Sequence, residues 1–475
     1  MNLFDDSEYF FDNDENSADK SEHDSNLNRR DFSNFSENPD SSMDPEYLEE
    51  SVNYLMDNGN FETALKYINI LLEHYPFSTD AFHKKALILD GLGNYKESIE
   101  FYEKAINCNP LDVEIYLNKA ITLDSWGKKH AAIETYKTAL SIEPENAEVL
   151  FNLGLCYERI EKFSEAIDIF QQLIELKPNY KDAYYELGYC YDFLDMYNKS
   201  IECYNKHLEF SPTNYNAWYN RGIVLNRQGK YLKAIESYEM CLALCENFAS
   251  AWYNAANAYA SLGRLLKAIE YYRKSISLRK NDAFSYHNIG NAYEELKEYE
   301  KAIDNFSKAL EIDSKNYESY YGRGNCYYCL GDYSKALDNY NSALILCNDY
   351  SELWYSKADA EYAAGNFTDA VKSYEKVLEI DSTNYDAWFD YGCALLDLKK
   401  YDEALNSFDR CIKCYSGWAE PYYEKAKIYF IKAEIEKGLE MIEIGFRLNP
   451  SDRFEFNFEK DWKKVTDFLM NRNSD

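Results

Sequence analysis

The sequence has few basic residues, few histidines and no long apolar run. Lysine and arginine together number 51 against 83 aspartates and glutamates, which gives a formal net charge of -32. A surface that neutralises phosphates needs a basic field, so this balance disfavours nucleic acids and anionic membranes and favours a basic protein segment as partner. Because the sequence lacks an apolar run of about 18 residues, no membrane insertion is expected.

Signatures of catalytic and metal chemistry are also missing. The six histidines show no HExxH or other ligand spacing. Cys326 and Cys329 form one CxxC pair and Cys411 and Cys414 another, but 81 residues (330–410) separate the pairs. Most of the twelve cysteines recur at the same helix positions, so we interpret them as reduced packing thiols. We therefore predict no catalytic residue, no metal and no cofactor.

Residues 1–44 differ in composition from the rest of the chain. They contain 13 acidic and 3 basic residues, and serine and asparagine fill most of the gaps. Such a segment cannot bury enough apolar surface to offset its ordering entropy, which predicts a disordered acidic tail. Its start is acidic and lacks the apolar core of a secretory signal, so a cytoplasmic location is the default expectation.

From Pro45 onward the sequence repeats itself every 34 residues. Residues 216–222 (NAWYNRG) return as residues 250–256 (SAWYNAA), and residues 45–452 can be written as twelve repeats without insertion or deletion. Position 8 is Gly or Ala in eleven repeats and position 20 is small in all twelve, whereas positions 4, 17 and 24 are mostly aromatic. This alternation predicts two amphipathic helices per repeat that cross closely at the small residues.

Glycine and proline mark the two turns of the repeat. Position 15 is Gly in seven repeats, which predicts a tight turn after the first helix. Position 32 is Pro in six repeats, where it would end the second helix.

The pattern of small, aromatic, Gly and Pro positions resembles the tetratricopeptide repeat. The resemblance implies an all-α fold, an α-solenoid that forms a right-handed superhelix of about twelve helix-turn-helix repeats. It also implies that the first helices line a concave groove. Residues 453–475 are expected to form a C-terminal capping helix over the last repeat, because terminal repeats need a polar outer surface. They are too few for a catalytic domain, so the protein is not expected to be an enzyme.

The candidate binding residues lie beside the core stripe of the first helix, at positions 2, 5, 6, 9 and 12. Asparagine recurs at positions 6 and 9, and its amide can pair with both polar groups of an extended peptide backbone. This series resembles the asparagine ladder of O-linked N-acetylglucosamine transferases; the alternative, that it is only repeat consensus, stays open. Tyrosine recurs at position 5 and favours interfaces, although part of this aromatic series packs between helices. The predicted peptide-binding residues are Asn118, Asn152, Asn220, Asn254, Asn288, Asn257, Asn291, Asn325, Tyr219, Tyr253, Tyr321 and Tyr355.

Charge completes the functional prediction. Position 2 is acidic in nine repeats, so the groove would attract a segment that carries lysine or arginine. The alternative, that these are solvated acids favoured at a helix N-terminus, stays open. We predict a non-catalytic scaffold that binds an extended, basic peptide segment of a protein partner. The alternative is a substrate-recruiting subunit of an enzyme complex, such as a protein glycosyltransferase. The sequence does not indicate the oligomeric state.

Overall fold

The structure is a computed structural model that describes residue 39 and residues 43–450. This described part contains 24 α-helices and no strand. The helices follow one another in pairs, and each pair occupies one of the predicted repeats, which confirms the all-α solenoid fold. Almost all of the predicted acidic tail and the whole predicted capping helix fall outside the described residues.

The first helix of ten repeats occupies positions 1–13, and the other two first helices are one residue shorter. These helices are α1 (Pro45–Asp57), α3 (Thr79–Gly91), α5 (Val113–Ser125), α7 (Ala147–Glu158), α9 (Lys181–Phe193), α11 (Tyr215–Arg227), α13 (Ala249–Ser261), α15 (Ala283–Glu295), α17 (Tyr317–Cys329), α19 (Ser351–Ala363), α21 (Tyr385–Asp397) and α23 (Glu420–Ile431).

The second helix occupies positions 17–30 in every repeat. These helices are α2 (Phe61–His74), α4 (Tyr95–Cys108), α6 (Lys129–Ile142), α8 (Phe163–Leu176), α10 (Tyr197–Phe210), α12 (Tyr231–Leu244), α14 (Leu265–Leu278), α16 (Tyr299–Ile312), α18 (Tyr333–Leu346), α20 (Phe367–Ile380), α22 (Tyr401–Cys414) and α24 (Ile435–Leu448).

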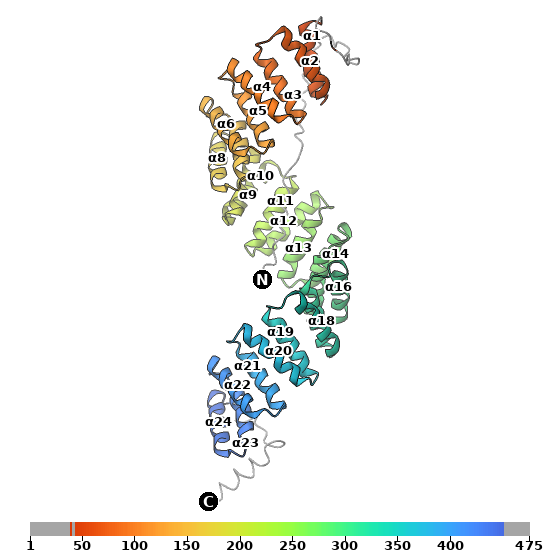
Figure 1. The fold of residues 1–475 in the computed structure, drawn as a ribbon, viewed down its shortest axis with the longest axis vertical. Helices are drawn as coiled ribbons and strands as arrows, with labels where there is room; N and C mark the ends of the chain where they lie inside the picture. The colour runs from red at the N-terminus through yellow and green to blue at the C-terminus, as the bar shows by residue number, and fades with distance from the viewer. Residues whose placement is uncertain (1–38, 40–42, 451–475) are drawn as a thin grey trace, which may run out of the picture. The chain divides into compact units, whose positions relative to one another are not determined.

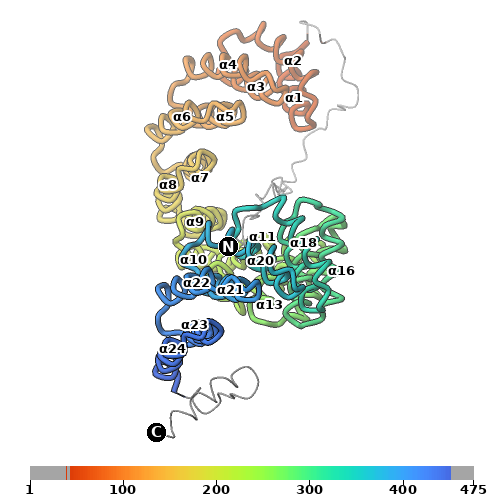
Figure 2. The backbone as a smooth tube through the Cα atoms, turned by 60° about the horizontal axis from the view of Figure 1, so that its bottom comes forward, coloured from red at the N-terminus to blue at the C-terminus, as the bar shows by residue number. Residues whose placement is uncertain are grey.

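The chain divides into an N-terminal half, which ends at Asn247, and a C-terminal half, which begins at Phe248. Within either half, each helix packs on the other helix of its pair, and each second helix also packs on the next first helix (Figures 1 and 2). First helices of neighbouring repeats touch as well, as α3 and α5 do in one half and α15 and α17 in the other. Residues at equal positions of neighbouring first helices therefore come near each other.

The close crossing within each pair forms as predicted. A Cβ added to Gly222 in α11 would lie 2.5 Å from the ring of Tyr238 in α12, which is closer than real Cβ contacts. Position 8 of the first helix thus lies directly under the aromatic ring at position 24. The same approach occurs at Gly154, Gly188, Gly290, Gly324 and Gly392.

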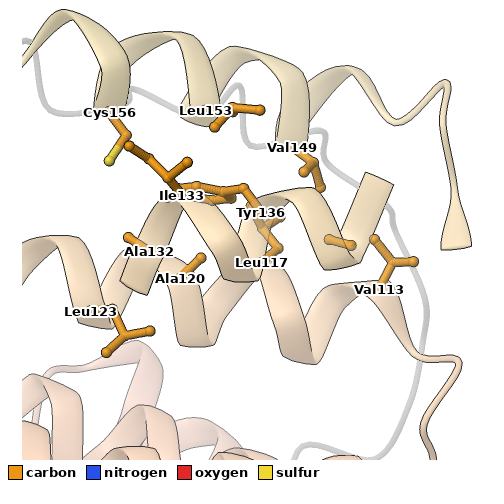
Figure 3. Close-up of a cluster of buried hydrophobic side chains, with 11 residues drawn as sticks. Val113, Leu117, Ala120, Leu123, Ala132, Ile133, Tyr136, Val149, Leu153 and Cys156 are labelled. Atoms are coloured by element: carbon orange, nitrogen blue, oxygen red, sulfur yellow. The ribbon is translucent and has the colours of Figure 1, made fainter. Parts of the chain in front are cut away.

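The core continues from one repeat to the next. Figure 3 shows a cluster to which α5, α6 and α7 contribute, with Tyr136 of α6 between the flanking helices. Tyr136 is 1% exposed, and Ala120 and Ala132 are fully buried where α5 and α6 meet. Cys156 of α7 belongs to the same cluster and is fully buried, which agrees with a packing role.

The turn after the first helix has the same left-handed residue in every repeat. All seven glycines at position 15 have positive φ, between 68° and 78°. The other five repeats force a residue with a side chain into this region, with φ between 56° and 60°. The residues concerned are Glu161, Asp195, Lys297, Lys399 and Ala433. The helix crossing therefore imposes this backbone conformation, and glycine at position 15 removes the strain that a side chain would cause.

The second turn depends on more than proline. The second helix ends at position 30 in repeats with proline at position 32 and in repeats without it. In both kinds of repeat, the side chain at position 34 can cap the following first helix: Asn214 accepts from the amide of Ala217, and Asn384 from that of Ala387. This cap was not among the sequence predictions, and it is present in three of the six repeats that lack proline, at Asp282, Asn316 and Asn384.

Exchanging glycine and side-chain residues at position 15 should change stability in opposite directions. Gly331→Ala should lower the free energy of unfolding by about 1 kcal/mol, and Lys297→Gly should raise it by up to about 1 kcal/mol, because only glycine adopts positive φ without strain. Urea denaturation followed by circular dichroism measures both. Lys308→Gly, inside α16, is the matched control and should be destabilising. A destabilising Lys297→Gly would contradict the interpretation.

Candidate functional site on the first helices

The first-helix face, defined here as positions 2, 5, 6, 9 and 12 of each first helix, carries the predicted binding residues. In the N-terminal half, the Asn220 amide Nδ2 donates to the hydroxyl of Tyr185, 2.9 Å away in the preceding repeat. The Asn118 Nδ2 likewise lies 3.0 Å from Nε2 of His83. Burial lowers the pKa of His83, so its neutral ring can accept this bond. Position 6 thus bonds to position 5 of the repeat before it.

The C-terminal half repeats this arrangement. The Asn288 Nδ2 donates to the hydroxyl of Tyr253 at 3.1 Å, and the hydroxyls of Tyr321 and Ser356 lie 3.2 Å apart. The hydroxyl of Tyr355 donates to a carboxylate oxygen of Asp390. Each pair is 35 residues apart, so this series of position 5 to position 6 bonds ties neighbouring repeats together. Several predicted binding residues therefore also stabilise the stack.

Position 9 is tied to the core of its own repeat. The Tyr272 hydroxyl donates to Oδ1 of Asn257 at 2.5 Å, and Tyr340 donates to Asn325 at 2.8 Å. In repeat 8, position 24 is Phe306, which has no hydroxyl, and Asn291 bonds to Nε2 of His287 instead. The Asn257 oxygen is engaged in this way, whereas its amide nitrogen has no partner among the described residues.

The predicted residues differ in how accessible they are. Tyr219 and Asn220 are each 1% exposed, whereas Asn291 is exposed. Asn152 donates to the backbone oxygen of Glu148 in its own helix rather than to a neighbouring repeat. Intermediate exposure is shared by Asn118, Asn152, Asn254, Asn257, Asn288, Asn325, Tyr253, Tyr321 and Tyr355.

Two carboxylates on this face were missed by the sequence analysis. Asp359 occupies position 9 of repeat 10, where it accepts from the Tyr374 hydroxyl at 2.6 Å as the asparagines do in repeats 7 and 9. Burial, together with the charge of Asp390, raises the pKa of Asp359 to about 6. Burial also raises the pKa of Asp390. The signal was available, because Asp359 continues the register of Asn257, Asn291 and Asn325.

Buried acids on the first helices are stabilised in two ways, by ion pairs or by hydroxyl donors. In the N-terminal half, Asp192 at position 12 pairs with Arg227 of the next repeat at 2.9 Å, and Asp124 pairs with Arg159 in the same register. In the described C-terminal half, neither Asp359 nor Asp390 forms an ion pair; each accepts a tyrosine hydroxyl instead. This part of the face therefore carries uncompensated negative charge.

The CxxC pairs do not converge. Cys326 and Cys411 are buried, whereas Cys329 and Cys414 are exposed, so the two members of each pair lie in different surroundings. Across residues 43–450 no three His, Cys, Asp or Glu side chains are placed to hold a metal ion. The helices described here are also too short or too polar for any of them to cross a membrane.

Comparison with protein families identifies the repeat. Tetratricopeptide repeat models match residues 182–214, 214–281, 247–315, 282–349 and 355–417. A model of the tetratricopeptide repeats at the N-terminus of Psidin matches residues 50–186. The chain is built from tetratricopeptide repeats. This confirms the resemblance to the repeat, whereas the resemblance of the asparagine series to that of O-linked N-acetylglucosamine transferases stays a prediction.

Solved structures of tetratricopeptide repeat proteins are similar to parts of this one. YrrB, described as a TPR protein with an unusual peptide-binding site, is 29% identical over 38% of this chain and 94% of its own, with a TM-score of 0.36. MamA is 27% identical over 36% of this chain and 93% of its own (TM-score 0.35). A chain in the structure of the APC/C hetero-tetramer Cut9–Hcn1 is 14% identical; the match covers 86% of the present chain and 94% of the matched chain, with a TM-score of 0.37. No curated protein matches the chain.

Asp359→Asn should stabilise the protein at neutral pH. The folded-state pKa of Asp359 is raised to about 6, so the folded protein binds the extra proton and loses stability as pH rises from about 4 to about 6. Asparagine keeps the acceptor for Tyr374 and removes this loss. Urea denaturation at pH 4 and pH 7.5 should show a gain only at the higher pH, whereas the exposed Asp338→Asn should show no such difference. A gain that is equal at both values would contradict the assignment.

The bond between Asn288 and Tyr253 should appear as coupling between repeats 7 and 8. In a double-mutant cycle of Asn288→Ala and Tyr253→Phe, we expect a coupling free energy of about 0.5–1.5 kcal/mol for the lost hydrogen bond. Denaturation midpoints of the four proteins supply it. Tyr286→Phe combined with Asn288→Ala is the control and should be additive, because residues two apart on a helix do not face each other. If the effects of Asn288→Ala and Tyr253→Phe were additive, the hydrogen bond between these residues would not stabilise the protein.

Proposed function

We propose that the protein is a non-catalytic scaffold that binds an extended, basic segment of a protein partner along the first-helix face of the C-terminal half. Tetratricopeptide repeats support protein–protein interaction in general, and the residues of this face support the narrower proposal. The observation that carries it is the run of position 9 residues: Asn257, Asn291 and Asn325, followed by Asp359.

The amides supply hydrogen-bonding capacity at a regular interval. Because Tyr272 occupies the oxygen of Asn257, the amide orientation is fixed and its nitrogen is the group left for a ligand. Asn291 is exposed on the neighbouring first helix. A donor on each successive helix suits the carbonyl groups of an extended chain, which recur along its length.

The carboxylates supply charge selectivity. Asp359 and Asp390 hold carboxyl groups at partly buried positions, and no cation from residues 43–450 pairs with either, so an approaching lysine or arginine would relieve both desolvation and mutual repulsion. A basic residue near these carboxylates, with neutral backbone across the asparagines, would also fix the direction of the bound segment.

The test is a comparison of basic and neutral peptides. Fluorescence anisotropy would measure binding of labelled, unstructured twelve-residue peptides that carry lysine at every third position, and of the same peptides with norleucine instead. The lysine peptides should bind more tightly than the norleucine peptides. The combined substitution Asp359→Asn and Asp390→Asn should weaken binding of the lysine peptides about tenfold and reduce its salt dependence, because two negative charges are lost. Both asparagines keep their tyrosine partners, so the fold should be unchanged.

The control has the same change in charge away from the face. Asp304→Asn with Asp338→Asn alters two exposed second-helix carboxylates and should leave affinity nearly unchanged. Equal weakening by both double variants would assign the effect to net charge alone. Equal binding of the lysine and norleucine peptides would overturn the basic specificity.

A further inference from the structure

A pocket of 420 Å³ lies between α20, α21 and α22, on the side of α21 opposite the first-helix face. Its volume falls within the range of about 300–1,000 Å³ that is typical of ligand sites. Trp388 and Tyr391 of α21 line it, together with Glu375 and Glu379 of α20 and with Glu403 and Ser407 of α22. The pocket thus combines aromatic surfaces with several carboxylates.

Repeat 6 shows what the same position holds elsewhere in the chain. There Arg221, at position 7, places its guanidinium 5.4 Å from the ring centroid of Trp218 at position 4. Its Nε donates to Asn205 on the preceding second helix at 2.7 Å, and a terminal nitrogen donates to Ser237 on the repeat's own second helix at 2.7 Å. An aromatic ring and two acceptors therefore receive one arginine.

Repeat 9 has an arginine at the same position, with its two donor nitrogens exchanged between the acceptor positions. Arg323 lies 5.5 Å from the ring centroid of Tyr320 and donates to Asn339 at 2.7 Å and Ser307 at 3.0 Å. The acceptors again occupy position 25 of the preceding repeat and position 23 of the repeat itself. Because two repeats agree, position 4, position 23 and position 25 of the preceding repeat are together called the arginine-binding positions.

Repeat 11 keeps the arginine-binding positions but has no arginine at position 7. Trp388 occupies the aromatic position, and Glu375 and Ser407 occupy the two acceptor positions, but position 7 is Tyr391. Ser407 donates to the backbone oxygen of Trp388, as Ser237 donates to its own helix, so its lone pairs can still accept a hydrogen bond. The Tyr391 hydroxyl donates to one oxygen of Glu375 at 2.9 Å.

The tryptophans at position 4 differ in whether a cation of this chain lies over the ring. Trp218, Trp252 and Trp354 each carry a cation of this chain over the ring: Arg221, Lys274 and Lys357, respectively. Among the described residues, no cation covers Trp388, although its indole nitrogen is anchored to the backbone oxygen of Ser382 at 3.0 Å. Its ring is therefore held in place; the Tyr391 ring lies edge-on to it with 6.2 Å between the ring centroids, and both rings line the pocket.

The charge of the pocket is only partly compensated. Glu379 and Glu403 form exposed ion pairs with Lys376 and Lys400 one turn away, whereas the Tyr391 hydroxyl is the one partner of the Glu375 side chain among the described residues. A cation that enters the pocket would find one carboxylate without a positive partner and two more nearby.

We propose that this pocket binds the guanidinium group of an arginine side chain presented by a partner protein. The guanidinium would lie over the indole of Trp388 and donate to Glu375 and Ser407, as Arg221 does to its own acceptors in repeat 6. A planar fork suits two separated acceptors better than an ammonium group does. The site is separate from the first-helix face and does not depend on the function proposed there.

Fluorine NMR of the full chain labelled with 5-fluorotryptophan tests this directly. The protein has seven tryptophans, and Trp388→Phe identifies the resonance of Trp388. The probe is the peptide acetyl-Gly-Arg-Gly-amide, and the matched probe replaces arginine with uncharged citrulline. The arginine peptide should produce a saturating shift at Trp388 and none at Trp354, which Lys357 already covers.

Two variants decide between a guanidinium site and non-specific contact. Glu375→Gln should weaken binding about tenfold, because a charged acceptor is lost. Tyr391→Arg should abolish the shift by filling the pocket from within, with unchanged helicity by circular dichroism. An equal shift with citrulline, an unchanged dissociation constant in Glu375→Gln, or a folded Tyr391→Arg protein that still responds would each overturn the proposal.

Discussion

The structure depends on the contact between a small residue at position 8 and the aromatic ring at position 24 of the same repeat. Because the Gly222 backbone lies against the ring of Tyr238, the two helices of a pair approach more closely than ordinary side chains allow. That distance determines the crossing of each pair. It also explains why the turn at position 15 must adopt positive φ even where Lys297 or Ala433 resists it.

Regular crossing also creates the two kinds of site. The faces of neighbouring first helices come together, so a hydroxyl at position 5 meets an amide at position 6 of the next repeat, as Tyr185 meets Asn220. On the other side of the first helix, position 7 meets the preceding second helix. In repeat 11, where position 7 is Tyr391 and not arginine, a pocket lies among these helices.

The sequence predicts the helix pairs and their crossing, because these follow from a local period that twelve repeats reinforce. It predicts the functional use of the asparagines less well. Whether an amide at position 6 faces a ligand or the neighbouring repeat depends on the residue 35 positions earlier, and whether the oxygen at position 9 is free depends on a hydroxyl at position 24. Phe306 and Tyr272 decide the second point differently in adjacent repeats. The cap at position 34 was visible in the sequence, but its role follows only from the turn geometry.

The bonds that link position 5 to position 6 join only adjacent repeats, so each half behaves as links in series. Tension along such a series acts on every junction equally, and extension begins at the junction with the weakest cross-link. The junction between repeats 10 and 11, with a charge-assisted bond from Tyr355 to Asp390, should yield later than the junction between repeats 9 and 10, where two hydroxyls meet. The side chain at position 6 thus contributes to the resistance of each junction, together with the packing of the second helix on the next first helix.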